Sequence, residues 1–476
     1  MIDYEFLNQI RQNIREKKDA IATLRNRRIN SNPYYYGRLL NSLRHIIPSG
    51  ARVLNIGCGT GYILNQLKPE YGVGVEASAE QIKIAREKYP ELEFHDQYLD
   101  NTQVTGVFDY IVISGIEDTV DVKAVFDSIR PNCGRHTRII VNYYNYLWQP
   151  LVTLAEKCRM RIPQHVHNWF SDPDIANLLQ LSGFDKINNI KIILFPFYIP
   201  LLSTLIDRFL ARLPGIRNLT MTRLTVARLK PASNKREYSV SVVIPCRNEA
   251  GNIEDAVKRV PQLGSHTEII FCDDKSTDGT PDIVRSMQKK YPDKDIKLVN
   301  GPGICKADNV WTGFDAATSD ILLILDADLT VIPEELPYFY EAIASGHGEF
   351  INGSRLVYPM HDEAMRFCNI IGNKFFSTFF SYILDTEIKD TLCGTKVLWR
   401  DDFEKVKKLR GHWGIKDRWG DYELIFGAAK NHLKIVDMPV HYMERTYGET
   451  KMTNRFKNGW IMLRMCMVSL FKIKFH

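Results

Sequence analysis

Short apolar runs alternate with amphipathic segments along most of the chain. The first half contains four such runs, at 53–56, 73–75, 110–113 and 138–141. Segments with helical spacing of apolar residues, such as 79–88 and 122–129, separate them. Strands that alternate with helices predict βαβ units and a parallel sheet. Residues 1–45 show the same helical spacing among many charges and are predicted to be helical.

The alternation stops near Leu229 and resumes after a polar stretch. Residues 231–237, which begin with a proline, are interpreted as a linker. Beyond the linker, four further strands are predicted, at 240–244, 268–271, 296–299 and 321–325. The sequence therefore predicts an α/β fold with two Rossmann-like domains, 1–230 and 238–476.

Composition narrows the classes of function. The 476 residues carry a net charge of only +6, and no basic motif with interleaved aromatic residues occurs, so we expect no nucleic-acid partner. None of the nine cysteines forms a Cys-x-x-Cys pair, which argues against zinc and dithiol chemistry. Scattered thiols suit a reducing compartment, and the charged N-terminus has no apolar signal core. We therefore expect a cytoplasmic protein.

No segment reaches the roughly 20 apolar residues that a membrane span needs. The nearest, residues 192–206, contains two prolines and is interpreted as a buried strand and helix cap. Two later segments are candidates for contact with a membrane surface. Residues 366–384 are rich in phenylalanine, and residues 452–474 mix apolar side chains with Lys and Arg but contain no acid. Such helices are typical of the membrane interface, although these two could instead pack together as core.

A glycine-rich turn follows the first predicted strand. Gly57, Gly59 and Gly61 lie between this strand and a helix-like segment, in a GxGxG spacing rather than the GxGxxG of dinucleotide-binding folds. Glycines let the backbone approach a ligand closely. After the next predicted strands, Glu76 can accept both hydroxyls of a ribose, and Asp96 can accept from an exocyclic amine.

These residues resemble the class I S-adenosylmethionine-dependent methyltransferases over roughly residues 35–230. The resemblance implies that the three glycines line the amino-acid end of S-adenosylmethionine, that Glu76 holds the ribose and that Asp96 holds the adenine edge. Asn55 stands where the family usually has Asp, and Ile116-Glu117-Asp118 replaces the usual Glu-His. These departures leave open a domain that is a non-catalytic binding scaffold.

The methyl acceptor is not identified by the sequence. An aromatic cluster follows the fourth predicted strand and could cap an acceptor pocket or simply pack beneath a lid: Tyr143, Tyr144, Tyr146, Trp148, His165, His167 and Trp169. A histidine there could act as a general base, but nothing selects which.

Three successive strands of the second domain lead into acids. Glu249 follows the first, Asp274 follows the second, and Asp326-Ala327-Asp328 follows the apolar run 321–325. The carboxyl edge of an open α/β sheet is where ligands bind. The Asp-x-Asp spacing puts Asp326 and Asp328 on the same side of an extended segment, and hard oxygen ligands suit Mg²⁺ or Mn²⁺ completed by substrate phosphates. We therefore predict a metal-held diphosphate.

This half of the chain resembles the family 2 glycosyltransferases with a GT-A fold, and among them the dolichol- or polyprenol-phosphate sugar synthases, over about residues 238–455. The resemblance implies that Pro245, Glu249 and Asp274 hold the nucleotide, with Lys306 as a further nucleotide contact. It also implies that Asp326 and Asp328 hold the metal and that the anomeric carbon is inverted. Blocks at 353–355, 390–396 and 444–451 match successive family blocks.

An acceptor phosphate is already ionised, so it needs cations rather than a base. The candidates are Arg355, Arg366, Arg445 and Lys451. We expect a peripheral enzyme at the cytosolic membrane face that moves a sugar from a nucleotide sugar to a polyprenyl phosphate. A glycan or soluble acceptor is the alternative, and a homo-oligomer is left open.

Overall fold

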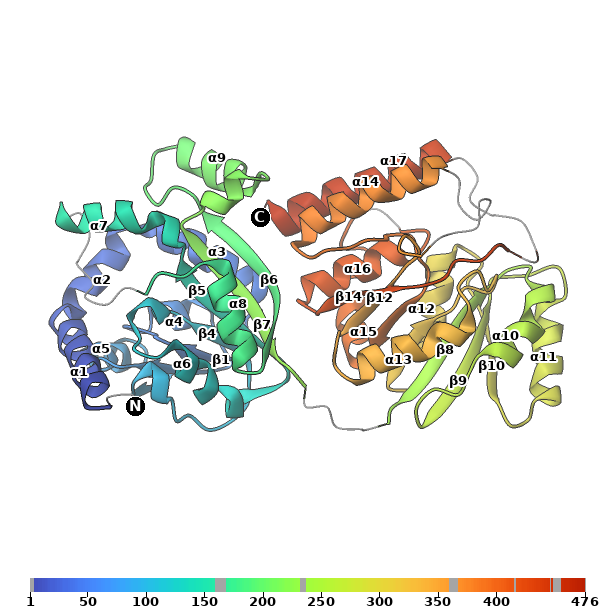
Figure 1. Ribbon diagram of the computed structural model, residues 1–476, viewed down its shortest axis with the longest axis horizontal. Coiled ribbons are helices and arrows are strands. Elements are labelled where there is room, and N and C mark those ends of the chain that lie inside the picture. The colour runs from blue at the N-terminus through green and yellow to red at the C-terminus, as the bar shows by residue number, and fades with distance from the viewer. Residues whose placement is uncertain are drawn as a thin grey trace. The chain divides into compact units, whose positions relative to one another are not determined.

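The chain forms two compact units, Met1–Lys230 and Pro231–Lys474, in a computed structural model (Figure 1). The structure describes residues 4–158, 168–231, 237–358, 367–414, 417–445, 447 and 455–475. Each unit is built around a seven-stranded sheet. The predicted α/β class with two Rossmann-like units is confirmed.

The first sheet has the strand order β3-β2-β1-β4-β5-β7-β6. Its strands are β1 (Arg52–Ile56), β2 (Tyr71–Glu76), β3 (Glu93–Asp96), β4 (Phe108–Ile113), β5 (Cys133–Tyr144), β6 (Phe184–Ile193) and β7 (Thr222–Leu229). Strands β1 to β5 are parallel, and β7 runs antiparallel to both β5 and β6. Because β1 to β5 point the same way, the residues that follow them meet at one edge of the sheet.

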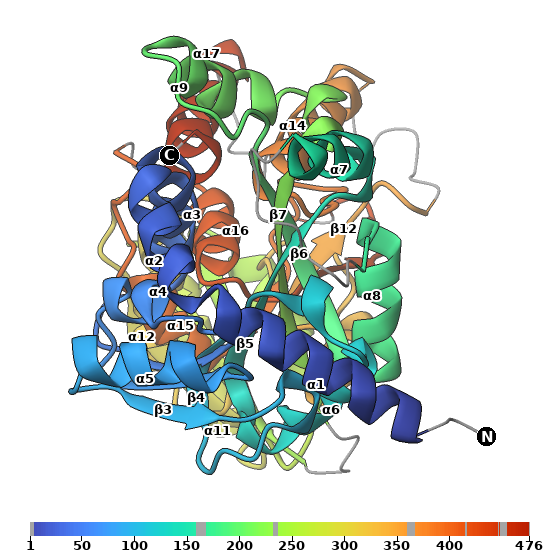
Figure 2. The ribbon, with the colours of Figure 1, turned by 90° about the vertical axis from the view of Figure 1, so that its left-hand side faces the viewer.

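Helices cover both faces of this sheet. The helices are α1 (Tyr4–Ala20), α2 (Ala22–Ser31), α3 (Pro33–Ile46), α4 (Tyr62–Gln66), α5 (Ala79–Lys88), α6 (Val122–Ser128), α7 (Gln149–Lys157), α8 (Asp172–Leu181) and α9 (Leu202–Arg208). Apolar side chains of α6 and α8 pack on one face of the sheet, and those of α3, α4 and α5 pack on the other. Helix α5 begins where the Ser78 hydroxyl accepts from the Gln81 amide at 3.2 Å, which is an N-cap. Figure 2 shows α1 lying across the front of this unit.

The prediction for residues 192–206 is only partly right. Strand β6 ends at Ile193, and α9 begins at Leu202. The residues between them are not buried, since Tyr198 is 63% exposed and Leu201 is 81% exposed. The prolines at 196 and 200 interrupt regular structure here, and the large apolar side chains face outward instead.

The second sheet has the order β10-β9-β8-β11-β13-β12-β14. Its strands are β8 (Ser239–Cys246), β9 (His266–Asp273), β10 (Asp295–Asn300), β11 (Ile321–Ile324), β12 (Phe350–Ser354), β13 (Lys396–Trp399) and β14 (Ile435–Pro439). Strand β13 is antiparallel to β11 and β12, and the other pairings are parallel. Strands β8, β9 and β11 therefore carry their carboxyl ends to one edge.

The helices of the second unit also lie in two layers. They are α10 (Ile253–Arg259), α11 (Thr280–Lys290), α12 (Lys306–Ala316), α13 (Leu336–Ala344), α14 (Phe367–Leu384), α15 (Arg400–Lys407), α16 (Asp421–Lys430) and α17 (Arg455–Ser469). Helices α10, α11 and α13 share one apolar core with the sheet. On the other side, Trp311 and Phe314 of α12 contact Phe403 of α15.

Helices α14 and α17, which were predicted to contact a membrane surface, contact each other (Figure 1). Part of their surface is therefore buried in the protein, as in the alternative in which the two helices pack together. Phe380 and Met465 are fully buried there. Phe375, Trp460 and Phe471 remain at least half exposed, at 56%, 63% and 50%. Among the described residues, no helix combines the length and the apolarity needed to cross a bilayer. The pair therefore has both a packed face and an outward aromatic face.

Candidate active sites

The glycine turn of the first unit is held tightly against the neighbouring strand. Gly57 has a φ of +75°, and a Cβ at this position would lie 1.9 Å from the carbonyl oxygen of Ser114, which follows β4. No side chain fits there without displacing the backbone. The turn therefore requires glycine at 57 for steric reasons, and it leaves its backbone open to a close ligand.

Polar atoms without partners surround this turn. Asn55 Oδ1, Gln81 Oε1 and Ser114 Oγ are buried and have no hydrogen-bond partner among the described residues. Buried polar atoms in proteins are nearly always paired, so unpaired ones call for a ligand. Atoms that can accept hydrogen bonds suit the ammonium group and hydroxyls of S-adenosylmethionine. The predicted cofactor therefore fits this turn, even with Asn55 in place of Asp.

Helix α1 supplies a cation to each acid at this edge. Lys18 Nζ lies 3.0 Å from Glu76 Oε1, and Arg15 pairs with Asp96. Arg11 Nη2 lies 2.8 Å from a carboxylate oxygen of Asp100, which follows β3. The three cations are spaced i, i+4 and i+7, so they lie along one face of the helix. Sequence analysis missed this contact, although the same spacing was readable in the charged N-terminal segment.

Glu76 is the most enclosed of these acids. Its side chain is 1% exposed, and Oε2 accepts from the Gly59 amide at 3.1 Å. Burial disfavours the carboxylate, but the charges of Lys18 and Arg25 outweigh burial and hold the pKa of Glu76 below its ordinary value. Glu76 is therefore a preformed anion next to the glycine turn. Its outer oxygen is engaged by α1.

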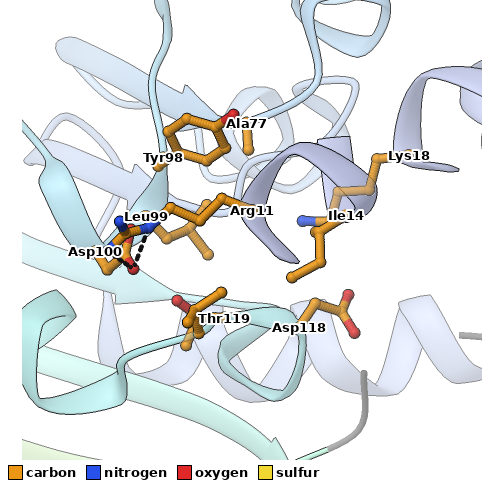
Figure 3. A pocket seen from close by; sticks show the side chains of 10 residues that line it. Arg11, Ile14, Lys18, Ala77, Tyr98, Leu99, Asp100, Asp118 and Thr119 are labelled. Carbon is orange, nitrogen blue, oxygen red and sulfur yellow. Dashed lines mark hydrogen bonds and ion pairs between the residues drawn. The ribbon is translucent and has the colours of Figure 1, made fainter. Parts of the chain in front are cut away.

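Figure 3 shows the space that α1 leaves at this edge. The cavity has a volume of only about 20 Å³ and is lined by residues including Arg11, Lys18, Ala77, Leu99 and Asp118. That volume holds roughly one water molecule. An adenine ring needs far more room, so α1 must shift before a nucleoside can occupy this part of the edge.

The predicted aromatic cluster divides between two environments. Tyr143 is 1% exposed and donates to Asp172 Oδ1 at 2.8 Å, so it is part of the core. Tyr144 and Trp148 line a separate cavity of about 770 Å³. His165 and His167 lie outside the described residues. Within this cluster, Tyr143 therefore packs in the core, whereas Tyr144 and Trp148 line a pocket.

The second unit gathers three of the predicted nucleotide contacts at one edge. Pro245 is in β8 beside Cys272 of β9, and the Asp274 amide donates to the Cys246 carbonyl at 2.9 Å. Glu249 is 5% exposed and accepts from Asn252 at 2.8 Å. Asp274 Oδ1 accepts from the Gly303 amide at 2.7 Å. Glu249 and Asp274 are therefore fixed carboxylates.

Asp326 and Asp328 follow β11 at the same edge, and each has a cationic partner. Lys306 Nζ, at the start of α12, lies 2.5 Å from Asp326 Oδ1, and Arg445 pairs with Asp328. Thr330 donates its hydroxyl to Asp328 Oδ1 at 2.9 Å. The backbone of Gly394 crosses Asp326 so closely that a Cβ there would lie 2.2 Å from Oδ2. Both carboxylates are thus oriented by their surroundings.

The electrostatic balance keeps Asp326 ionised. Burial disfavours the charge, but Lys306, Lys396 and Arg355 together hold the pKa of Asp326 below its ordinary value. Side-chain exposures of 26% for Asp326 and 13% for Asp328 leave oxygen atoms accessible. Among the described residues no group of three or more His, Cys, Asp or Glu side chains is placed to hold a metal. Two carboxylates that leave the remaining positions to phosphate oxygens fit the way proteins hold Mg²⁺.

Arg355 is anchored rather than free. Its Nε lies 2.7 Å from Asp390 Oδ2 and its Nη2 lies 2.9 Å from Asp390 Oδ1, which is a bidentate pair. Asn373 also donates to Asp390 Oδ1, at 2.7 Å. Burial alone would raise the pKa of Asp390, but the charge and hydrogen bonds of Arg355 outweigh burial. The pKa of Asp390 therefore lies well below its ordinary value. Arg355 therefore holds the segment that leads to Gly394, beside Asp326.

Of the other predicted acceptor cations, Arg445 reaches the Asp328 side of the site. Arg366 and Lys451 lie outside the described residues. Two polar groups at the same site were missed by the sequence analysis: Lys396 Nζ lies 2.8 Å from Asp421 Oδ1, and both are buried. Lys396 is in a block already matched to the family, but only the fold shows that its charge acts on Asp326.

Comparison with known proteins finds one family match in each half of the chain. Residues 25–189 match the family profile described as "Methyltransferase domain", and residues 241–407 match "Glycosyl transferase family 2". The chain joins a methyltransferase domain to a family 2 glycosyltransferase domain. The first match contains the glycine turn and Glu76, and the second contains Glu249, Asp274 and the Asp326/Asp328 pair. The predicted family resemblances are thereby confirmed.

Relatives of the glycosyltransferase domain include polyprenol-linked enzymes. The chain is 38% identical over 120 residues to dolichol-phosphate mannosyltransferase of Pyrococcus furiosus, covering 25% of this chain and 33% of that protein. It is 26% identical over 228 residues to polyprenol monophosphomannose synthase of Mycolicibacterium smegmatis, covering 47% and 84%. An undecaprenyl-phosphate 4-deoxy-4-formamido-L-arabinose transferase of Aeromonas hydrophila is 33% identical over 112 residues, covering 23% and 34%. The chain thus spans about a third of the length of the Pyrococcus and Aeromonas relatives.

Solved structures with partial similarity exist for both domains. Magnesium protoporphyrin IX methyltransferase from Synechocystis, solved with bound SAH, has a TM-score of 0.34 and 15% identity, covering 46% of this chain and 99% of that one. Glucosyl-3-phosphoglycerate synthase from Mycobacterium tuberculosis, solved with Mn²⁺ and UDP, has a TM-score of 0.36 and 15% identity, covering 50% and 80%.

Proposed function

We propose that the glycosyltransferase domain moves a sugar from a nucleotide sugar to a polyprenyl phosphate, with a divalent cation and with inversion at the anomeric carbon. The observation that supports this most is that Asp326 and Asp328 lie together at the same sheet edge as Glu249 and Asp274, each with a cationic partner. Relatives named for dolichol, polyprenol and undecaprenyl phosphates support the acceptor class.

Each side chain has a separate task in this proposal. Glu249 and Asp274 hold the ribose and base of the donor, and Asp326 and Asp328 would hold Mg²⁺ or Mn²⁺. The cation stabilises the charge that develops on the departing nucleotide diphosphate. Lys306 lies against Asp326, where it can add a second positive charge near that diphosphate. An ionised acceptor phosphate attacks without a general base, so positioning by arginines is what it needs.

The acceptor side of the site is proposed to contain Arg445, with Arg355 as a positioning residue. Arg445 reaches Asp328 from beyond β14 and is 26% exposed, so its guanidinium is accessible to a phosphate. Arg355 is committed to Asp390 and keeps the segment up to Gly394 against Asp326. Arg366 and Lys451 stay candidate phosphate contacts on family resemblance alone.

A donor screen with a polyprenyl phosphate acceptor tests this proposal. Nucleotide sugars of several bases and sugars are incubated with the full chain, the lipid and Mg²⁺ or Mn²⁺, and lipid products are read by mass. We expect one donor to give a lipid mass increased by one sugar residue. Transfer only to glycans or soluble alcohols would replace the lipid proposal with the alternative acceptor class.

We further propose that the methyltransferase domain binds S-adenosylmethionine at the glycine turn. The three unpaired acceptor atoms around this turn support it, together with the ionised Glu76. One observation favours a second candidate, a non-catalytic scaffold: α1 already provides partners for Glu76 and Asp96 and closes the adjoining space. Calorimetric titration with S-adenosylmethionine separates the two. Binding that is lost in Glu76→Gln supports the cofactor site, and no heat at millimolar cofactor supports the scaffold.

We also propose a peripheral position at the cytosolic face of a membrane. The outward aromatic side chains Phe375 of α14, Trp460 of α17 and Phe471, just beyond the end of α17, support this contact because large aromatic groups favour the interface. A monomer with two sites is sufficient for the proposed chemistry, and a homo-oligomer is not required by it.

A further inference from the structure

The large cavity of the methyltransferase domain has a mainly aromatic and aliphatic lining, with no charged side chain. It measures about 770 Å³, and its lining includes Tyr34, Tyr144, Trp148, Leu151, Ala155 and Tyr198. This size and composition are typical of small-molecule sites. No Asp, Glu, Lys or Arg is in the lining. An ionic ligand group would find no countercharge on these walls.

The polar tips of two lining aromatics, Tyr34 and Trp148, are bonded to the protein. The Tyr34 hydroxyl lies 2.7 Å from Asp207 Oδ2 and 2.8 Å from the Ser203 carbonyl oxygen, and it shares its one proton between these two acceptors. The Trp148 indole N–H donates to the Leu219 carbonyl at 2.7 Å. These bonds anchor the rings by their edges. What remains for a ligand is mainly carbon surface, so the cavity suits an apolar chain or ring.

The cavity adjoins the proposed cofactor site. Tyr144 ends β5 at the same sheet edge as the glycine turn, and its amide donates to Glu117 Oε1 at 2.8 Å just beyond β4. Arg25 lies between the cavity and the glycine turn. Its Nε is close to Gly59, because a Cβ built on Gly59 would lie 3.2 Å from it. Burial opposes the charge of Arg25, but Tyr36, Glu76, Asp118 and Tyr144 together raise its pKa. The Arg25 guanidinium thus interacts electrostatically with Glu76 beside the turn and with two tyrosines of the cavity, Tyr36 and Tyr144.

The rim of the cavity is apolar on its outer side as well. Leu151 of α7 lines the cavity and is 56% exposed, and Leu154 on the same helix is equally exposed. On the other side, Tyr198 lines the cavity and runs into Leu201 and Leu205, which are 81% and 53% exposed. Exposed apolar side chains on two segments beside one cavity are the kind of surface that marks an interaction site. A soluble acceptor would not require it.

We propose that this cavity binds the apolar chain of a membrane lipid, an isoprenoid or similar amphiphile, as the methyl acceptor. The inference rests on the proposed S-adenosylmethionine site. In this proposal the apolar chain of the lipid lies among the aromatic rings of the cavity. The polar head of the lipid points past Tyr144 toward the glycine turn. In the transfer, a nucleophilic head atom bonds to the methyl carbon as the carbon–sulfur bond breaks. Sulfur keeps the electron pair, and any proton on the head atom passes to water.

The bilayer is the occupant that the rim surface fits best. The rim combines exposed leucines with the exposed Tyr198, and side chains of both kinds favour the membrane interface. The second domain is proposed to work on a polyprenyl phosphate, so both reactions would draw substrates from one membrane. An isoprenoid chain also suits a cavity walled by aromatic rings, because both are apolar and rigid enough to pack without hydrogen bonds.

Cavity binding is tested with farnesol as probe and the full chain in calorimetry. Ala155→Trp fills the cavity from α7, and Ala155→Ser at the same position leaves its volume nearly unchanged. We expect farnesol affinity to fall at least about tenfold in Ala155→Trp and to be retained in Ala155→Ser. S-adenosylmethionine affinity and the melting temperature serve as controls that the domain is folded and should not change.

The outcomes distinguish this inference from the proposed function. If S-adenosylmethionine binds but farnesol does not, or if Ala155→Trp binds farnesol as well as the wild type, the lipid site is wrong and the cofactor site stands. If farnesol binding depends on residue 155 while S-adenosylmethionine never binds, the apolar site stands and the methyl-acceptor role is wrong.

Vesicle sedimentation tests the rim with phosphatidylcholine–phosphatidylglycerol vesicles. The double substitution Leu201→Ser/Leu205→Ser should lower the vesicle-bound fraction. Leu181→Ser is the matched control, because Leu181 is 70% exposed on α8 and belongs to neither of the two rim segments. An equal loss in both variants, or no loss in the double variant, would overturn the assignment of the rim to the bilayer.

Discussion

Acids at both candidate sites are kept ionised by partners from distant parts of the chain. Glu76 is paired with Lys18 across 58 positions, and Asp390 is paired with Arg355. Such buried pairs are costly to break, because removal of one partner leaves the other charge without compensation. At this scale the sites are defined by charge pairing as much as by the ligating residues themselves.

Asp390→Asn should destabilise the glycosyltransferase domain by about 3–5 kcal/mol, since it leaves the buried Arg355 without a counter-ion. The lowered pKa of Asp390 also predicts the pH dependence. The contribution of ionised Asp390 to the free energy of unfolding is complete above the unfolded pKa of about 4. It is lost as the pH falls toward the lower pKa that Asp390 has in the folded protein. The melting temperature of the wild type should thus exceed that of Asp390→Asn at pH 7, and the difference should become smaller in acid. A constant difference across this range would argue against the pairing.

Arg445→Ala should reduce sugar transfer to the lipid phosphate while leaving nucleotide affinity intact. Arg247 provides a matched contrast, because its Nη1 lies 3.9 Å from Asp274 Oδ2 on the nucleotide side. Arg247→Ala should weaken nucleotide binding instead. Steady-state transfer and nucleotide titration of both variants give the comparison. Loss of nucleotide affinity in Arg445→Ala would assign that arginine to the donor.

At the scale of elements, α1 decides access to the cofactor site. Three cations on one helix face meet three acids at the ends of β2 and β3 or just beyond β3. The Arg15–Asp96 pair is about a third exposed on both sides and contributes little, whereas the buried Lys18–Glu76 pair opposes displacement of the helix. The closed geometry in Figure 3 is therefore compatible with cofactor entry at a cost.

The triple substitution Arg11→Gln/Arg15→Gln/Lys18→Gln should raise affinity for S-adenosylmethionine by roughly tenfold, or about 1.4 kcal/mol, because α1 no longer competes for the acids. Lys17→Gln, on an exposed position of the same helix, is the control and should bind like the wild type. Calorimetry provides both affinities. Weaker binding in the triple variant would mean that these cations contact the cofactor.

The pair α14 and α17 makes a separate prediction. Trp460→Ser/Phe471→Ser removes outward aromatic surface without touching buried Phe380 or Met465. We expect a smaller vesicle-bound fraction at an unchanged melting temperature. Retained vesicle binding would leave the rim of the first domain as the main membrane contact.

Much of the element order was readable from the sequence, and the limits are physical. Strands such as β1 and β11 and helix α5 were predicted because a regular period of apolar residues marks them. The partners of the acids were not, because Lys18 and Lys396 reach their acids through long-range packing that local patterns do not encode. Residues 192–206 were interpreted as a buried strand and helix cap, yet the large side chains between β6 and α9 face outward beside a cavity.

At the scale of the whole molecule, two candidate sites lie on two separate sheets. They share no residue, and a divalent cation is proposed for the glycosyltransferase site alone. Both are proposed to draw on membrane lipids, one through a phosphate head and the other through an apolar chain.

Independence of the sites is directly testable. Glu76→Gln should abolish S-adenosylmethionine binding and leave sugar transfer unchanged, and Asp274→Asn should do the reverse. Both activities measured on the same preparations provide the check. If either substitution impaired both sites in a folded protein, the two domains would be coupled.

The central claim is that Asp326 and Asp328 hold a catalytic divalent cation for transfer to a polyprenyl phosphate. The most direct measurement is transfer by the wild type and Asp328→Ala across a titration of Mn²⁺ and after chelation. Asp282→Ala, at an acid on α11 whose side chain is 82% exposed, is the control. We predict transfer that requires the metal in the wild type and the control and is lost in Asp328→Ala at every metal concentration. Undiminished transfer in Asp328→Ala, or transfer that survives chelation, would contradict the account.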